Sequence, residues 1–199
     1  MRNWLFHPLV FYPLVLLLAA GCIVASLAPQ LWPKPPAAQA GLVQSGAVLI
    51  QGAAFDTPDP SPDQNMTVGR DVWGHAQTLR IAVLPNQPSP SPAEQGVRIL
   101  LTPQTAALLQ DRPVTLEVTY RPVPVNAATG LAVSLQGIGP ADWVTQPIAP
   151  QSGTVRFQLP ASANVEAIGL RAMSSAQDQA YGVEIVRIRA VPNSPAAGG

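Results

Sequence analysis

The sequence predicts an all-β fold, an antiparallel β-sandwich, preceded by one N-terminal transmembrane α-helix. Three observations lead to this prediction. The twenty residues from Leu9 to Ala28 carry no charge. Short segments that alternate apolar and polar residues follow them. The chain of 199 residues also contains 23 prolines and 15 glycines, which favour many turns over long helices.

The most regular alternation runs over residues 114–120, where Val, Leu and Tyr occupy one face of a strand and Thr and Glu the other. One short helix is expected at Pro103–Leu109, with Thr102 as its N-cap and proline at its first position. A parallel sheet would need more crossover helices than this, so the pairing is expected to be antiparallel. Further strands are expected at Ala47–Gln51, Thr78–Leu84, Val97–Leu101, Leu131–Leu135, Val155–Leu159, Ile168–Leu170 and Val183–Val191.

Composition shifts divide the chain into four parts. Residues 1–28 are the apolar segment, and residues 29–41 form a Pro-rich linker of extended character. Residues 42–191 form the β-sandwich, and the small residues 192–199 are expected to be a disordered tail. Within the sandwich, the proline-rich segments 56–63 and 85–92 are expected to be surface loops outside the core.

The apolar segment indicates where the rest of the chain works. Twenty helical residues, at about 1.5 Å each, match a hydrocarbon core of roughly 30 Å. We therefore predict a single-pass helix in a bacterial inner membrane, with a cytoplasmic N-terminus and a periplasmic C-terminal domain. The aromatic residues expected at the membrane interfaces are Trp4, Phe6, Phe11, Tyr12 and Trp32.

Two other interpretations of this segment remain open. Leu18 to Cys22 resembles a lipobox, in which case the signal ends at Cys22 and this cysteine is lipidated. The apolar residues 23–27 argue against it, because lipoproteins usually become polar after the cysteine. A cleaved secretory signal would have its best site at Ala38–Ala40, well beyond the apolar run. All three interpretations place the remaining domain on the same side of the membrane.

The charge and cysteine counts exclude several classes of function. Eleven basic and eleven acidic residues give a net charge of zero, which does not favour a nucleic-acid partner. Cys22 is the only cysteine, so the outer domain can contain neither an intramolecular disulfide nor a cysteine metal cluster. Neither a metal site nor a cofactor is predicted.

Three side chains are candidates for a ligand or partner surface. Trp73 and His75 lie in the segment 70–75, where the alternative is a tryptophan that plugs the end of the sandwich. Trp143 is either a stacking platform for a sugar ring or a core residue beneath a loop. We also expect Arg171, Arg187 and Arg189 to form a small basic stripe if the last two strands pair.

The sequence offers little for catalysis. It lacks the His-Glu-x-x-His and Gly-x-Ser-x-Gly patterns and a Gly-rich phosphate loop. Outside the N-terminal segment it has one histidine and no cysteine. We therefore predict that the chain is not an enzyme.

The order of the later strands resembles the jelly-roll domains of carbohydrate-binding modules, which share the galactose-binding-like sandwich. The closing segment 182–188, Gly-Val-Glu-Ile-Val-Arg-Ile, carries most of the likeness, which extends over about 47–191. The resemblance implies a jelly roll that often binds sugars through exposed aromatic residues or a loop site. No ligand motif of the family can be transferred to particular positions here.

These observations predict a non-catalytic, membrane-anchored periplasmic β-sandwich. We expect it to act as an accessory or scaffolding subunit of an envelope or inner-membrane complex, with membrane lipid and other subunits as partners. The aromatic start of the chain, richer than anchoring requires, motivates this prediction. The alternative is a tethered module that binds an envelope polysaccharide through Trp143 or through Trp73 and His75.

Overall fold

The computed structural model describes residues 8–27, 41–56, 58–59, 64–85, 96–174 and 179–193. Its contacts divide the chain into two units, Met1–Ala37 and Ala38–Gly199. Trp4, Phe6, Trp32, most of the predicted linker and residues 194–199 lie outside the described residues.

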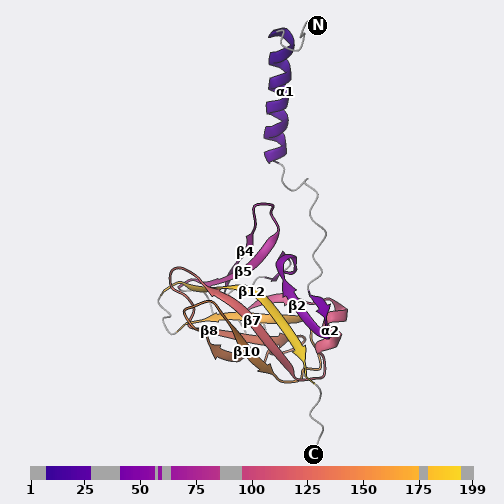
Figure 1. Cartoon of the computed structure of the whole chain (residues 1–199), viewed down its shortest axis with the longest axis vertical. Coiled ribbons are helices and arrows are strands. Elements are labelled where there is room, and N and C mark those ends of the chain that lie inside the picture. The colour runs from indigo at the N-terminus through magenta and orange to yellow at the C-terminus, as the bar shows by residue number, and fades with distance from the viewer. Residues whose placement is uncertain are drawn as a thin grey trace, which may run out of the picture. The chain divides into compact units, whose positions relative to one another are not determined.

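The first unit contains helix α1 (Pro8–Leu27), so the uncharged segment is helical as expected (Figure 1). Its large apolar side chains between Phe11 and Ile23 are exposed, and so is Cys22. The rings of Phe11 and Tyr12 meet edge to face, with their centroids 5.9 Å apart. In the described part of the chain no helix is both long and apolar enough to cross a membrane, which leaves the predicted transmembrane span unsupported.

The second unit is built from two antiparallel sheets, as the alternating pattern predicts (Figure 1). The first sheet contains β1 (Leu42–Gln44), β2 (Ala47–Gln51), β4 (Asn65–Arg70), β5 (Ala76–Val83), β7 (Val114–Pro122), β10 (Gly153–Leu159) and β12 (Tyr181–Pro192). The second contains β3 (Pro58–Asp59), β6 (Val97–Leu100), β8 (Gly130–Gln136), β9 (Val144–Pro147) and β11 (Ala167–Met173). A short 3-10 helix, η3 (Gly52–Asp56), follows β2.

Strand β12 organises the first sheet. Along one edge it pairs with β5 through its first half and with β2 through its second half. Along the other edge it pairs with β7, which in turn pairs with β10. The second sheet has the order β3-β6-β11-β8-β9. The last two strands of the chain therefore lie in different sheets.

A contiguous hydrophobic core lies between the sheets. Leu116 and Val118 of β7 and Phe157 of β10 are fully buried on the inner side of the first sheet. Leu131 of β8 and Ile168 of β11 are fully buried in the second sheet and belong to the same cluster. The apolar positions of the predicted strands thus form one core, as expected of a sandwich.

Helix α2 (Pro103–Leu109) has the predicted bounds and N-cap. The Thr102 hydroxyl accepts a hydrogen bond from the backbone N–H of Thr105 at 3.3 Å. Proline at the first helical position costs no hydrogen bond, because that N–H would have no partner within the helix. Leu109 is fully buried and joins the helix to the core.

Four strands were not expected from the sequence: β1, β3, β4 and β9. They have two to six residues each, and they lie at the ends of the two strand orders, where each strand pairs with a single neighbour. Strand β3 occupies part of the predicted loop 56–63 and pairs with β6. Strand β12 extends to Pro192, one residue beyond the predicted end of the sandwich.

Candidate functional site

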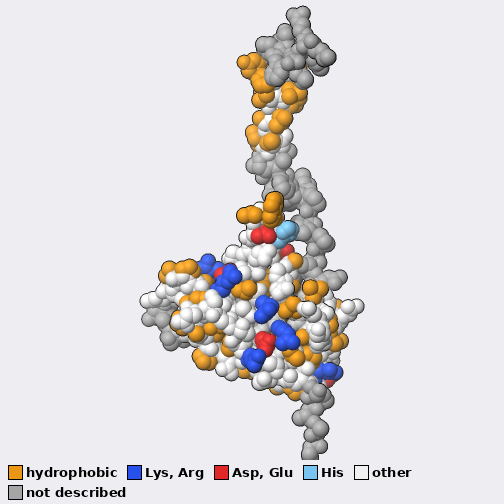
Figure 2. All heavy atoms as spheres, in the orientation of Figure 1, with side chains coloured by type: hydrophobic (Ala, Val, Ile, Leu, Met, Phe, Trp, Pro, Cys, Tyr) orange, Lys and Arg blue, Asp and Glu red, His pale blue; other side chains and the backbone are white. Residues whose placement is uncertain are grey.

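The hairpin of β4 and β5 carries the first candidate surface. Figure 1 shows these strands extending beyond the rest of the sandwich, and Figure 2 shows hydrophobic side chains at the end of the projection beside a histidine. Val72 is 93% exposed and Trp73 is 81% exposed. Trp73 therefore does not plug the sandwich, and its ring is available to a ligand or partner. We call residues 71–75 the hairpin tip.

The carboxylate of Asp71 organises this tip. Its Oδ1 accepts hydrogen bonds from the backbone N–H groups of Trp73 and His75, both at 2.9 Å. Its Oδ2 accepts from the side chain of Gln77 at 3.3 Å and lies 3.4 Å from Nδ1 of His75. The hydrogen bond from the backbone N–H of His75 is the main reason that the pKa of Asp71 lies below its ordinary value. The carboxylate thus fixes the turn that displays the tryptophan.

Two further contacts hold the base of the tip. Asp71 donates its backbone N–H to the carbonyl of His75 at 2.9 Å, and Arg70 donates to the carbonyl of Gly74, also at 2.9 Å. Gly74 has a φ of +83°, a conformation that side chains other than glycine rarely adopt. Arg70 also pairs with Asp56 of η3, which joins the hairpin to the sandwich. The tip is therefore well ordered by its own hydrogen bonds.

Trp143 is in a different environment. It is half-buried just before β9, and its indole Nε1 is buried without a hydrogen-bond partner. A Cβ built on Gly96 would lie 2.5 Å from the edge of the indole ring, so the ring packs closely over that glycine. This is the packed arrangement of the two that the sequence allowed. The structure does not bring Trp143 together with the hairpin tip as one exposed surface.

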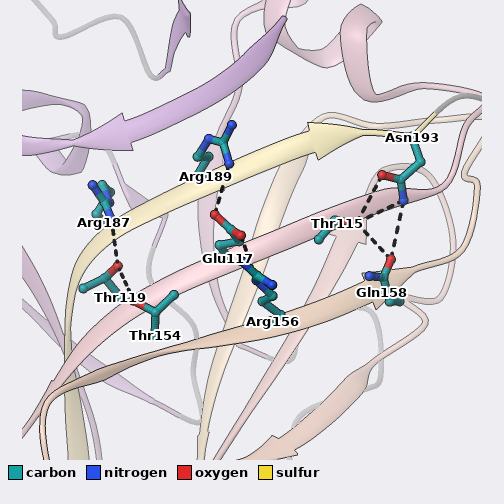
Figure 3. Close-up of polar contacts among 9 residues, drawn as sticks. All are labelled: Thr115, Glu117, Thr119, Thr154, Arg156, Gln158, Arg187, Arg189 and Asn193. Atoms are coloured by element: carbon teal, nitrogen blue, oxygen red, sulfur yellow. Dashed lines mark hydrogen bonds and ion pairs between the residues drawn. The ribbon is translucent and has the colours of Figure 1, made fainter. Parts of the chain in front are cut away.

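The outer face of the first sheet carries a second candidate surface, which sequence reasoning largely missed. Figure 3 shows that polar side chains from β7, β10 and β12 form cross-strand contacts there, with Asn193 at the end of β12. Glu117 lies at the centre and accepts from Arg156 at 2.8 Å and from Arg189 at 3.2 Å. We call this surface the polar face. It consists of Thr115, Glu117, Thr119, Thr154, Arg156, Gln158, Arg187, Arg189 and Asn193.

The expected basic stripe is therefore only partly correct. Arg187 and Arg189 lie together on β12, but Arg171 lies on β11 in the other sheet. Arg156 of β10 takes part instead, because β7 lies between β10 and β12 and carries Glu117. The alternation of polar and apolar residues in β10 predicts that Arg156 points away from the core. This local pattern does not predict the strand order that brings Arg156 near Arg189.

The charge state of Glu117 gives a pH-dependent prediction. Hydrogen bonds from Arg189 and then Arg156 lower its pKa below the ordinary 4.5, although burial acts in the opposite direction. A carboxyl whose pKa is lower in the folded state stabilises the fold above the unfolded-state pKa, and this contribution is lost as the pH falls through the folded-state pKa. Between pH 7 and pH 3, Glu117→Gln should therefore lose less free energy of unfolding than the natural chain. Equal losses in denaturant unfolding at the two pH values would contradict this.

The described residues contain no group of three or more His, Cys, Asp or Glu side chains that could hold a metal ion. The only histidine described, His75, is exposed and paired with Asp71. The hairpin tip displays an exposed tryptophan, and the polar face displays hydrogen-bonding and charged groups. Both surfaces are suited to binding.

Comparisons with solved structures identify similar folds. The apo structure of BiXyn10A CBM1 has 10% sequence identity and a TM-score of 0.46, and the match covers 73% of this chain and 96% of that one. The chain resembles carbohydrate-binding modules. The CBM22-1 xylan-binding domain of Xyn10C from Paenibacillus barcinonensis is 10% identical at a TM-score of 0.41, with 70% and 86% covered. Both matches are a likeness of fold.

Another similar structure comes from a different class of protein. The PRD1 vertex protein P5 is 12% identical at a TM-score of 0.32, and the match covers 74% of this chain and 95% of that one. No protein-family model matches the chain. No curated protein matches its sequence at a significant level.

Proposed function

We propose that this chain is a non-catalytic accessory or scaffolding subunit of an envelope or inner-membrane complex, and that it docks through the hairpin tip. The observation that carries the proposal is the exposure of Val72 and Trp73, at 93% and 81%, on a turn fixed by Asp71. Tryptophan is prominent among the residues that dominate protein–protein binding. A turn held in place by its own hydrogen bonds also loses little entropy on docking.

The N-terminal segment supports the same assignment. Residues 8–27 form a helix without a charged side chain, and its large apolar side chains between Phe11 and Ile23 are exposed. We propose that α1 tethers the chain to a bacterial inner membrane, with the N-terminus in the cytoplasm and the sandwich in the periplasm. Phe11 and Tyr12 then lie near one membrane interface. Membrane lipid and the other subunits of the complex are the proposed partners.

Trp73→Ala tests the docking proposal. The full-length chain and its variant are purified from native membranes in a mild detergent, and the copurifying proteins are quantified by mass spectrometry. Loss of a central tryptophan costs about 2 kcal/mol or more at a binding hot spot, so a partner should fall by roughly thirtyfold in affinity. The expected result is a specific set of envelope proteins that the natural chain retains and Trp73→Ala loses.

Ile138→Ala is the matched control, because Ile138 is also a large apolar residue and is 83% exposed, but lies outside the tip. This variant should retain the same proteins as the natural chain. The docking proposal fails if Trp73→Ala retains the full set, or if the natural chain purifies alone.

A second candidate function is the binding of an envelope polysaccharide. The polar face favours it, since hydroxyl, amide, carboxylate and guanidinium groups from neighbouring strands lie on one exposed surface (Figure 3). Such groups exchange hydrogen bonds with sugar hydroxyls. The exposed Trp73 offers an aromatic surface for a sugar ring as well. A glycan retained by the natural chain, without any copurifying protein, would favour this function over docking.

A further inference from the structure

We infer that the polar face contains a recognition site for the carboxylate groups of an acidic polysaccharide, with Arg187 and Arg189 as the recognising residues. The inference rests on the second candidate function and specifies its ligand. It is independent of the hairpin tip, because none of its residues belongs to that turn.

The site begins with an irregularity in β12. The pairing with β7 shifts register between Ile185 and Arg187, which marks a β-bulge. Val183 and Ile185 before the bulge are fully buried, as is Ile188 after it. With regular alternation, Arg187 would point to the same side as Ile185, into the core. The bulge reverses the two sides and turns Arg187 and Arg189 outward.

A hollow lies beside these two arginines. It has a volume of about 200 Å³ and is lined by Arg187 and Arg189 together with Gln44, Ser45, Ala47 and Leu49. The last four residues come from the hairpin of β1 and β2, which pairs with β12 through β2. Ser45 and Gly46 have φ values of +52° and +75°, so a tight two-residue turn closes this hairpin. The hollow thus has a cationic side on β12 and uncharged polar groups on the hairpin.

The charges around the hollow favour an anion. Among the residues of the polar face, three guanidinium groups accompany one carboxylate, that of Glu117. Glu117 pairs with Arg156 and Arg189. Arg187 contacts the hydroxyl of Thr119 at 3.5 Å, the outer limit of a hydrogen bond, and no described carboxylate pairs with it. Figure 2 shows this excess as blue side chains around a red one.

The surroundings of the arginines favour a carbohydrate as the carrier of that anion. A guanidinium group matches the planar shape of a carboxylate and donates two parallel hydrogen bonds to it. The hydroxyls of Thr119 and Thr154, which lie 3.0 Å apart, and the amide of Gln158 continue the surface beyond the arginines. These uncharged groups suit the hydroxyls of neighbouring sugar units.

The test uses the full-length chain in detergent and two forms of one polymer. Polygalacturonate carries a carboxylate on each sugar, and its fully methyl-esterified form has the same backbone without the charge. Binding is measured by affinity electrophoresis and by calorimetry. We expect binding to polygalacturonate that weakens with salt, and at least about tenfold weaker binding to the ester. Arg187→Gln with Arg189→Gln should reduce binding to polygalacturonate by at least tenfold.

Arg112→Gln, at an exposed arginine outside the polar face, is the control and should bind as the natural chain does. Arg189 contacts Glu117, so the double variant is checked by its melting temperature. Arg187→Gln alone, which breaks only the long contact to Thr119, provides a second variant should the double one unfold. This single variant should still lose several-fold in binding.

The outcomes separate the inference from the function on which it rests. Equal binding to the acid and the ester would overturn the anion site and leave polysaccharide binding standing. Binding to neither the acid nor the ester would overturn both the anion site and polysaccharide binding. Unchanged binding by the arginine variants would show that the anion binds elsewhere and would also overturn the inference. Arginine-dependent binding to phosphatidylglycerol vesicles without binding to polygalacturonate would assign the site to a lipid headgroup instead.

Discussion

Phe157→Ala is expected to remove about 3–5 kcal/mol from the free energy of unfolding. Phe157 lies on β10, opposite Leu116 of β7, and both side chains are fully buried in the core. Truncation removes the transfer free energy of the ring and leaves a cavity that the surrounding side chains fill only in part. Domains are typically stable by only 5–15 kcal/mol, so this one change removes a large share. The melting temperature should fall by roughly 6–20 °C.

The measurement is thermal and denaturant unfolding of the full-length chain, followed by circular dichroism. Thr154→Ala is the control on the same strand, since this exposed side chain makes one hydrogen bond, to Thr119. Its effect should stay within about 0.5 kcal/mol. A Phe157→Ala variant as stable as the control would mean that β10 does not pack into the core in the register seen here.

Phe157 also illustrates what local sequence can predict. In residues 153–159 the apolar side chains recur at every second position, which predicts both the strand and its buried face. The same holds for β2, whose predicted and observed bounds coincide, and for α2 with its threonine cap. These elements are determined by their own residues. Tertiary contacts pack their apolar sides together but do not set their bounds.

The elements that were missed depend on distant partners. Strands β1 and β3 have three and two residues, too few for an alternating pattern to be recognised. In β4 only Met66 and Val68 are apolar, and both are half-buried against the core, so the alternation is too short to predict a strand. It forms because β5 offers a complementary edge. Propensity in strands is dominated by such neighbours.

The candidate surfaces divide in the same way. Sequence alone singled out Trp73 and Trp143, because tryptophans are few and large, but left open which of them packs. Their exposure depends on the β4–β5 projection and on the close approach of Gly96 to the indole. The polar face depends on strand order and on one bulge in β12. The local signal for it was the alternation of polar and apolar residues in β7 and β10, which predicts an outward polar side for each strand but not their order in the sheet.

The largest effect expected from a polar substitution is at Gln64, where a side chain takes the place of a strand. Strand β6 pairs with Ala167–Leu170 of β11, and Val97, the first residue of β6, lies opposite Leu170. Beyond that point Gln64 donates to the carbonyl of Ala172 at 3.3 Å and accepts from its N–H at 3.1 Å. Gln64 is 3% exposed and Ala172 is 1% exposed. The amide side chain thus replaces the two backbone bonds that a longer β6 would make.

Gln64→Ala should therefore cost about 2–6 kcal/mol, because it leaves a buried N–H and a buried carbonyl of Ala172 without partners, at roughly 1–3 kcal/mol each. Gln151→Ala, at an exposed glutamine, should change stability by less than about 0.5 kcal/mol. Hydrogen exchange supplies a specific readout: the Ala172 amide should exchange faster relative to its neighbours in β11. A uniform change along β11 would contradict a local role for Gln64.

Gln64→Glu removes the hydrogen bond that Gln64 donates to Ala172 and keeps the one that it accepts. The carboxylate can still accept from the N–H of Ala172 but turns a second oxygen toward its carbonyl, so the variant should be destabilised at neutral pH. Burial and the facing carbonyl both disfavour the charged form and raise its pKa in the folded state. A raised carboxyl pKa means that stability is retained at low pH and lost as the pH rises. Gln64→Glu should accordingly approach the natural chain in stability as the pH falls, whereas Gln64→Ala should keep a constant deficit.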